Sequence, residues 1–216
     1  MNMPLQLQAK SGDMEGSSSS DHADDVPPLL PGTEEPRSLG DMLKAAEAAQ
    51  KDAELTPATP ATPGGAKPRR SKRPSRAQSR RFARERALQA LYQLDLSDAQ
   101  VSSLRQEFLD TQDMSRVDVD YFLLLFNGVA QSPDTLDKVL HDSLDRPVAD
   151  LDPIERCVLR IAAFELTQQL DIPARVVINE GIEITKRFGA DKGHRYVNGV
   201  LDKLAVQLRP NEMRPR

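Results

Sequence analysis

The sequence predicts an all-α domain that is preceded by a disordered N-terminal extension. From Ser79 onward apolar residues recur at helical spacing, and no alternating apolar and polar run of strand length interrupts them. The first 66 residues contain no Ile or Phe and a single Val, together with half of the prolines. About 130 residues are left for the folded domain, which is enough to bury a core without disulfides or metal.

The helical periodicity and its start and stop signals predict seven helices. Asp152-Pro153 with Glu155 marks one start, Pro173 marks the next, and Gly189 marks an end. Gly199 falls inside the last expected helix, where a glycine indicates close approach of a neighbouring helix. The expected helices cover residues 79–94, 101–109, a segment starting near 118, a segment starting at 133, 153–170, 173–188 and 193–207.

Charge divides the chain into blocks that the net charge of −4 conceals. Residues 1–66 form an acidic extension rich in Pro, Ser and Ala with a net charge of −7, and this composition predicts disorder. Residues 67–86 carry +9 and residues 87–216 carry −6. The predicted organisation is therefore the extension, a mobile basic arm over 67–79, a helical domain over 80–210 and a disordered tail over 211–216.

The basic block predicts contact with a polyanion. Arginine outnumbers lysine eight to two in it, which favours bidentate contacts with phosphate and stacking on bases. Arg76 lies in the arm, and Arg80 and Arg84 lie one helical turn apart. Two other interpretations stay open, namely a solvated linker and an internal partner for the acidic extension.

The rest of the sequence contains no pattern typical of catalysis or of metal or cofactor binding. The three histidines, His22, His141 and His194, have no second ligand at helical spacing. Cys157 lies among apolar residues, where a small buried side chain is expected, and a lone cysteine favours the reducing cytoplasm. No apolar run is long enough for a membrane span. The expected protein is therefore cytoplasmic, without membrane contact, and not an enzyme.

Four blocks of the sequence resemble the NusB family of transcription antitermination factors. Together they extend over about residues 80–210, in the family's order. The blocks are residues 80–92 (RRFARERALQALY), 154–166 (IERCVLRIAAFEL), 177–184 (VINEGIEI) and 196–203 (YVNGVLDK).

The resemblance implies a compact bundle of two small helical subdomains. It also implies binding to boxA-type RNA of ribosomal transcripts, together with the small-subunit ribosomal protein NusE, in the transcription elongation complex. Carried over residue by residue, the RNA contacts would be Arg80, Arg81, Arg84 and Tyr196, and the NusE contacts would be Tyr92 and Glu155. Phe82 stands where the family commonly has an arginine, so the basic stripe has one member fewer.

The residues around Tyr196 agree with an RNA contact but do not demand one. Lys192, His194 and Arg195 flank this tyrosine, and an aromatic ring beside cations suits stacking on an unpaired base. Because Tyr196 precedes the core position Val197, it could equally be a tyrosine at the edge of the core. From the basic block, the resemblance and the cations around Tyr196, the expected RNA-binding residues are Arg76, Arg80, Arg81, Arg84, Lys192 and Tyr196.

Three classes of function follow from these observations. The first is an RNA-binding antitermination adaptor, and the second is a helical protein–protein module whose basic arm pairs with its own acidic extension. The third is an RNA-methylating enzyme, because NusB-like domains also occur attached to such enzymes. The third class needs an α/β cofactor domain with a glycine-rich loop, and the sequence contains no such pattern.

Overall fold

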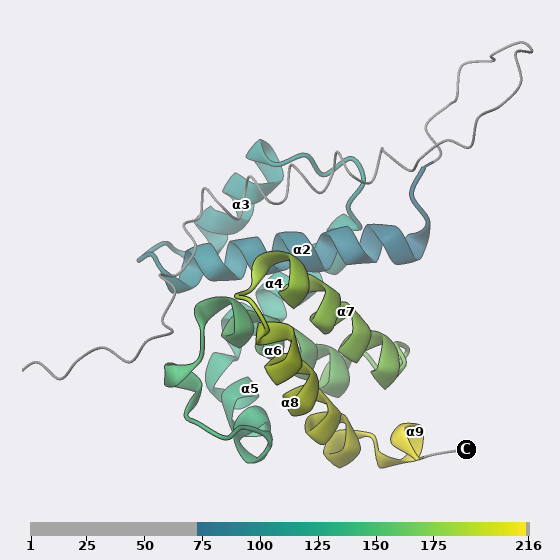
Figure 1. The fold of residues 1–216 in the computed structure, drawn as a ribbon. Coiled ribbons are helices and arrows are strands. Elements are labelled where there is room, and N and C mark those ends of the chain that lie inside the picture. The colour runs from purple at the N-terminus through teal and green to yellow at the C-terminus, as the bar shows by residue number, and fades with distance from the viewer. Residues whose placement is uncertain (1–72, 215–216) are drawn as a thin grey trace, which may run out of the picture. The chain divides into compact units, whose positions relative to one another are not determined.

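The computed structural model describes residues 73–214, which form helices joined by short connections (Figure 1). The described part contains no strand, so the prediction of an all-α fold is confirmed. None of its helices is both long and apolar enough to span a membrane. The elements are α2 (Arg76–Asp95), α3 (Val101–Thr111), α4 (Val119–Gln131), α5 (Pro133–Leu140), the 3-10 turns η1 (His141–Ser143) and η2 (Val148–Asp150), α6 (Pro153–Gln168), α7 (Ala174–Phe188), α8 (Gly193–Leu208) and α9 (Pro210–Met213).

Helix α2 begins earlier than the apolar periodicity predicts, because a capping box stands in front of it. The Ser75 hydroxyl accepts a hydrogen bond from the Gln78 backbone, and the Gln78 side chain accepts one from the Ser75 backbone. The last four residues of the predicted mobile arm, 76–79, are therefore helical. The acidic extension and the start of the arm lie outside the described residues.

Helix α2 is central to the packing, since α3, α4 and α6 all contact it. Its buried stretch runs without a break from Ala83 to Tyr92, so polar side chains are enclosed together with apolar ones. One group of helices, α2 to α4, is filled by the stacked rings of Phe108, Phe122 and Phe126. The other group comprises α5 to α9, in which α6 contacts α5, α7 and α8. These two groups are the two helical subdomains that the resemblance implied.

Two glycines permit close helix approach, and neither is the one that the sequence indicated. A Cβ on Gly128 of α4 would lie 2.2 Å from the Phe164 ring of α6. A Cβ on Gly181 of α7 would lie 2.9 Å from Leu201 of α8. The prediction for Gly199 is wrong, because this glycine is exposed and a Cβ there would meet nothing within 4 Å.

The C-terminal residues close the bundle instead of trailing from it. Arg209 is buried, and its guanidinium donates hydrogen bonds of 2.6 to 3.1 Å to backbone carbonyls at the end of α6 and after it. Glu212 of α9 accepts a hydrogen bond from the first backbone N–H of α7, at Ala174. Residues 211–213, which the sequence analysis assigned to a disordered tail, are thus part of a helix. The carbonyls bound by Arg209 belong to Glu165, Leu166, Gln169 and Ile172.

We predict that Arg209→Ala lowers the free energy of unfolding by about 3 kcal/mol, because several buried carbonyls lose a charged donor together. Arg214→Ala removes the same charge from an exposed position nearby and is the matched control. Chemical denaturation followed by circular dichroism measures both. Equal stabilities of the two variants would contradict the role given to Arg209.

Candidate nucleic-acid interface

The arginines at the start of α2 divide into exposed and buried side chains. Arg76 is exposed in the first turn, directly after the capping box. Arg81 is also exposed, and its Nε and Nη2 donate to the Glu180 carboxylate of α7 at 3.1 and 2.8 Å. This bond raises the pKa of Arg81. Because the pair uses one edge of the guanidinium, the Nη1 edge remains open to another anion.

The exposure of Arg80 is intermediate between that of the exposed arginines and that of a buried one. Its side chain is 21 % exposed, and its guanidinium lies 4.7 Å from the centre of the Tyr121 ring. The charge is shared between Asp118, at 3.8 Å, and Asp171, at 3.6 Å. Asp118 caps α4 and Asp171 lies just ahead of α7, so Arg80 lies where α4 and α7 begin.

Arg84 lies inside the domain, although the sequence places it one turn from Arg80. It is 3 % exposed, and its Nε and Nη2 approach the Glu165 carboxylate of α6 at 2.7 to 3.1 Å. Tyr121 of α4 hydrogen-bonds to the same carboxylate. Burial lowers the pKa of Arg84, but the Glu165 carboxylate outweighs this effect and the pKa is raised, so Arg84 stays charged inside the domain, where it positions α2.

A second candidate group lies where α7 ends and α8 begins. Lys192 is exposed and adopts a left-handed conformation, with φ 67°, directly before α8. Tyr196 follows in the first turn of α8, half-buried against the core, and burial raises its pKa to about 12. Its hydroxyl donates to Asp145 at 3.0 Å, and the Arg146 guanidinium lies 5.0 Å from its ring centre. Tyr196 is therefore packed at the edge of the core with part of its side chain exposed, and its contact with RNA stays a prediction.

The two residues expected to contact a protein partner lie near the start of α6. Tyr92 is only 1 % exposed, and burial raises the pKa of its hydroxyl. Glu155 is half-buried, and burial, with the nearby Asp152 carboxylate, raises its pKa to about 7. A Cβ on Gly193 would lie 2.5 Å from the Glu155 carboxylate, which shows how closely this side chain approaches α8. Glu155 therefore borders the Tyr196 group.

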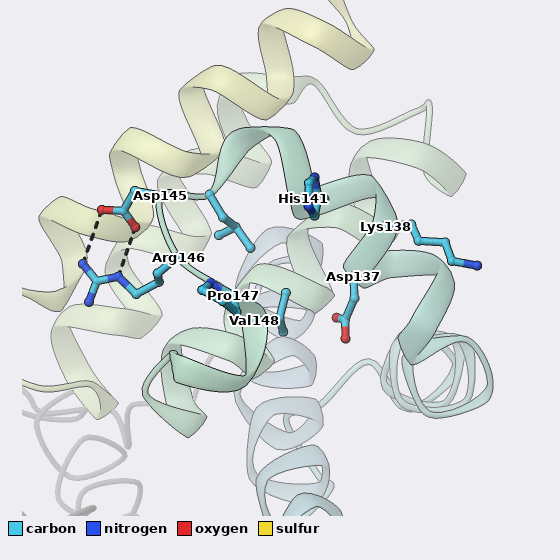
Figure 2. Close-up of a pocket in the computed structure, with 8 residues that line it drawn as sticks. Asp137, Lys138, His141, Asp145, Arg146, Pro147 and Val148 are labelled. Carbon is cyan, nitrogen blue, oxygen red and sulfur yellow. Dashed lines mark hydrogen bonds and ion pairs between the residues drawn. The ribbon is translucent and has the colours of Figure 1, made fainter.

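A cavity of about 610 Å³ lies beside the loop that carries Asp145 and Arg146 (Figure 2). Its apolar wall is Leu144, Pro147 and Val148, and Figure 2 shows the Asp145–Arg146 pair on one side of it and Lys138 on the other. Neither Asp145 nor Arg146 was identified from the sequence. They occupy an ordinary turn before a proline, and no local pattern connects them with Tyr196, 50 and more residues away.

The described residues show no arrangement typical of an active site or a metal site. They contain no group of three His, Cys, Asp or Glu side chains that could hold a metal ion. Cys157 is buried in α6, and burial raises the pKa of its thiol to about 12, which keeps it protonated and unreactive. The chemistry presented by this surface is that of cations, carboxylates and one aromatic ring.

Comparison with known proteins gives the family. The model of the NusB family matches residues 81–206. The transcription antitermination protein NusB of Idiomarina loihiensis is 52 % identical over 132 residues, which are 61 % of this chain and 95 % of that protein. The NusB of Alcanivorax borkumensis is 51 % identical over 146 residues, which are 66 % and 97 % of the two chains.

A solved structure agrees with these sequence matches. The structure of T. maritima NusB superposes with a TM-score of 0.54 at 30 % identity. It covers 62 % of this chain and 95 % of the other. These proteins share the region that contains the four sequence blocks and the buried Arg84 of α2. The chain therefore belongs to the NusB family.

Proposed function

We propose that this chain is an RNA-binding adaptor that acts on boxA-type RNA of ribosomal transcripts, together with NusE, in the elongation complex. A role in transcription antitermination follows from its family, whose relatives bear that name. The boxA-type RNA and NusE are what the resemblance of the four blocks implies. Such a role places the chain in the cytoplasm, where transcripts are made.

The observation that carries the proposal is a pair of exposed groups, one on the first turns of α2 and the other where α8 begins. Arg76 and Arg81 present positive charge on α2, with Arg81 paired to Glu180 in the middle of α7, and Lys192 presents it after the end of α7, beside the Tyr196 ring. Single-stranded RNA is bound by cations that contact its phosphates and by aromatic rings on which its bases stack. Arg84, because it is buried, supports this surface from within.

Glu155 is the residue that we propose for contact with the protein partner. Its carboxylate is partly withdrawn from water, and its charged form is disfavoured in the free chain. A cation on a partner would compensate that cost and favour the charged form. Tyr92 is almost wholly buried, so it would shape the contact surface from below.

The alternative function, a protein-interaction module whose arm pairs with the acidic extension, concerns segments that lie mostly outside the described residues. Measurement of RNA affinity with and without residues 1–66 separates the two. The adaptor binds RNA in both forms, whereas the alternative predicts no specific RNA affinity in either.

We predict that Arg76→Gln with Arg81→Gln weakens binding of boxA-type RNA and lowers its dependence on salt. Two lost phosphate contacts reduce the slope of log K against log salt by about 1.4. Fluorescence anisotropy with labelled RNA at several salt concentrations measures the slope. Arg84→Gln is the contrasting variant, because it removes a charge from the interior: it should lower stability and leave the salt slope of the folded protein unchanged.

We predict that Tyr196→Ala weakens RNA binding by roughly 1–3 kcal/mol, the contribution of one base–aromatic stack. Tyr196→Phe keeps the ring and should bind within about twofold of the unaltered chain. Affinity and melting temperature are measured on both variants. A strong fall in the melting temperature of Tyr196→Ala, with an unchanged affinity of the folded fraction, would assign the tyrosine to packing alone.

We predict that Glu155→Gln stabilises the free chain at pH 8 and has little effect at pH 5. The folded protein holds the Glu155 proton up to a pKa of about 7, whereas an unfolded chain releases it near the ordinary value of 4.5. Stability therefore falls as the pH rises between these two values, and the neutral amide avoids that fall. The expected gain at pH 8 is on the order of 1 kcal/mol, since the group is half-exposed and its charge is screened. An identical gain at both pH values would exclude this cause.

A further inference from the structure

The ring of Tyr196 is held by two adjacent residues of the loop between η1 and η2. Asp145 accepts a hydrogen bond from the tyrosine hydroxyl at 3.0 Å, and Arg146 lies over the ring. The two loop residues also bind each other, because Arg146 Nε and Nη2 donate to the two Asp145 oxygens at 3.0 and 3.3 Å. Figure 2 shows this bidentate pair at the edge of the cavity. Carboxylate, guanidinium and ring thus form one closed cluster.

The cluster is exposed and therefore opens easily. The side chains of Arg146 and Asp145 are 52 % and 57 % exposed, so water screens their attraction. The hydrogen bond from Arg146 is the main reason that the pKa of Asp145 is lowered, which keeps this carboxylate charged. A charged carboxylate in the fork of an arginine occupies the place that a phosphate would take.

We propose that Arg146 and Tyr196 together bind one nucleotide of RNA, and that Asp145 is an internal competitor for its phosphate. The phosphate enters the Arg146 fork and displaces the Asp145 carboxylate, Arg146 moves off the ring face that it covers, and the base stacks on the Tyr196 ring. This inference rests on the proposed RNA-binding function and adds a residue and a mechanism of competition to it.

The surroundings favour RNA over an acidic protein segment as the occupant. Lys192 and Arg195 are exposed on the same turn of chain as Tyr196, so positive charge continues past the cluster in the direction of α7. An acidic peptide would use the arginine but has no need of an accessible ring. A nucleotide uses both, because it carries a planar base and an anion on one flexible unit.

The first experiment compares Arg146→Gln with Arg105→Gln. Arg105 lies on α3 and hydrogen-bonds to Asn127, so its replacement is the same chemical change on a distant helix. The probe is a short single-stranded boxA-type RNA, titrated from 0.1 M to 1 M salt. One lost phosphate contact lowers the slope of log K against log salt by about 0.7. If Arg146→Gln and the unaltered chain bind equally at 1 M salt, the variant should therefore bind about fivefold more weakly at 0.1 M. The Arg105→Gln variant should match the unaltered chain in both quantities.

The second experiment tests the competition. Asp145→Asn keeps an acceptor for the tyrosine hydroxyl but removes the charge that holds Arg146, so binding of the same RNA should tighten by about threefold, less than the full effect of one phosphate contact. In the double variant with Arg146→Gln this gain should disappear, because the competitor has no arginine left to hold. If Asp145→Asn tightened binding equally with and without Arg146, Asp145 would only repel RNA through its charge. The proposed competition for Arg146 would then be wrong.

The outcomes separate this inference from the proposed function. If the unaltered chain does not bind the RNA, the proposed function itself fails. If Arg76→Gln with Arg81→Gln weakens binding and Arg146→Gln does not, the function stands and the role of Arg146 is wrong. If Arg146→Gln weakens binding of the protein partner alone, the cluster is a protein contact, which also overturns the inference.

Discussion

The buried ion pair between Arg84 and Glu165 fixes the orientation on which the rest of the surface depends. Both side chains are almost fully enclosed, at 3 % and 1 % exposed, where α2 crosses α6. A charge buried without its partner costs several kcal/mol, about 3–5 when one member of such a pair is removed. Rotation of α2 by one residue would therefore bury Arg84 without its carboxylate. The pair selects a single rotation, and that rotation leaves Arg81 on the outside.

Glu165 accepts hydrogen bonds from arginines of two distant parts of the chain, Arg84 in α2 and Arg209 after α8. Its carboxylate holds Arg84, and its backbone carbonyl accepts a hydrogen bond from Arg209, which arrives from the far end of α8. The end of α6 is thus held by one arginine through a side chain and by another through the backbone. Because Asp171 follows this end, the position of its contact with Arg80 depends on both. An effect of Arg209 on RNA binding would pass through this route.

The sequence predicts the helices well because helical periodicity is a local signal, but it does not predict which arginines face outward. The partners of Arg84 and Arg81 lie 81 and 99 residues away in the chain, and no spacing rule connects them. Arg209 was missed for the same reason, since its partners are carbonyls, which every residue has. The capping box of Ser75 is different. It is a local pattern of Ser followed three residues later by Gln, and it would have given the correct start of α2.

The distribution of charge fits the two separate contact groups that we propose. Residues 87–216 carry a net charge of −6, and the carboxylates of Asp118, Asp171 and Glu180 already pair with the arginines of α2. Each exposed group therefore offers only a few cations against an acidic background. Arg81 pairs with Glu180 in the middle of α7 and Lys192 follows its end, and the helix from Glu180 to Phe188 extends over about 12 Å, beyond the screening length of about 8 Å at physiological salt. In the function that we propose they act as independent weak contacts, so a strand held at one is presented to the other at high effective concentration, and affinity arises from holding both.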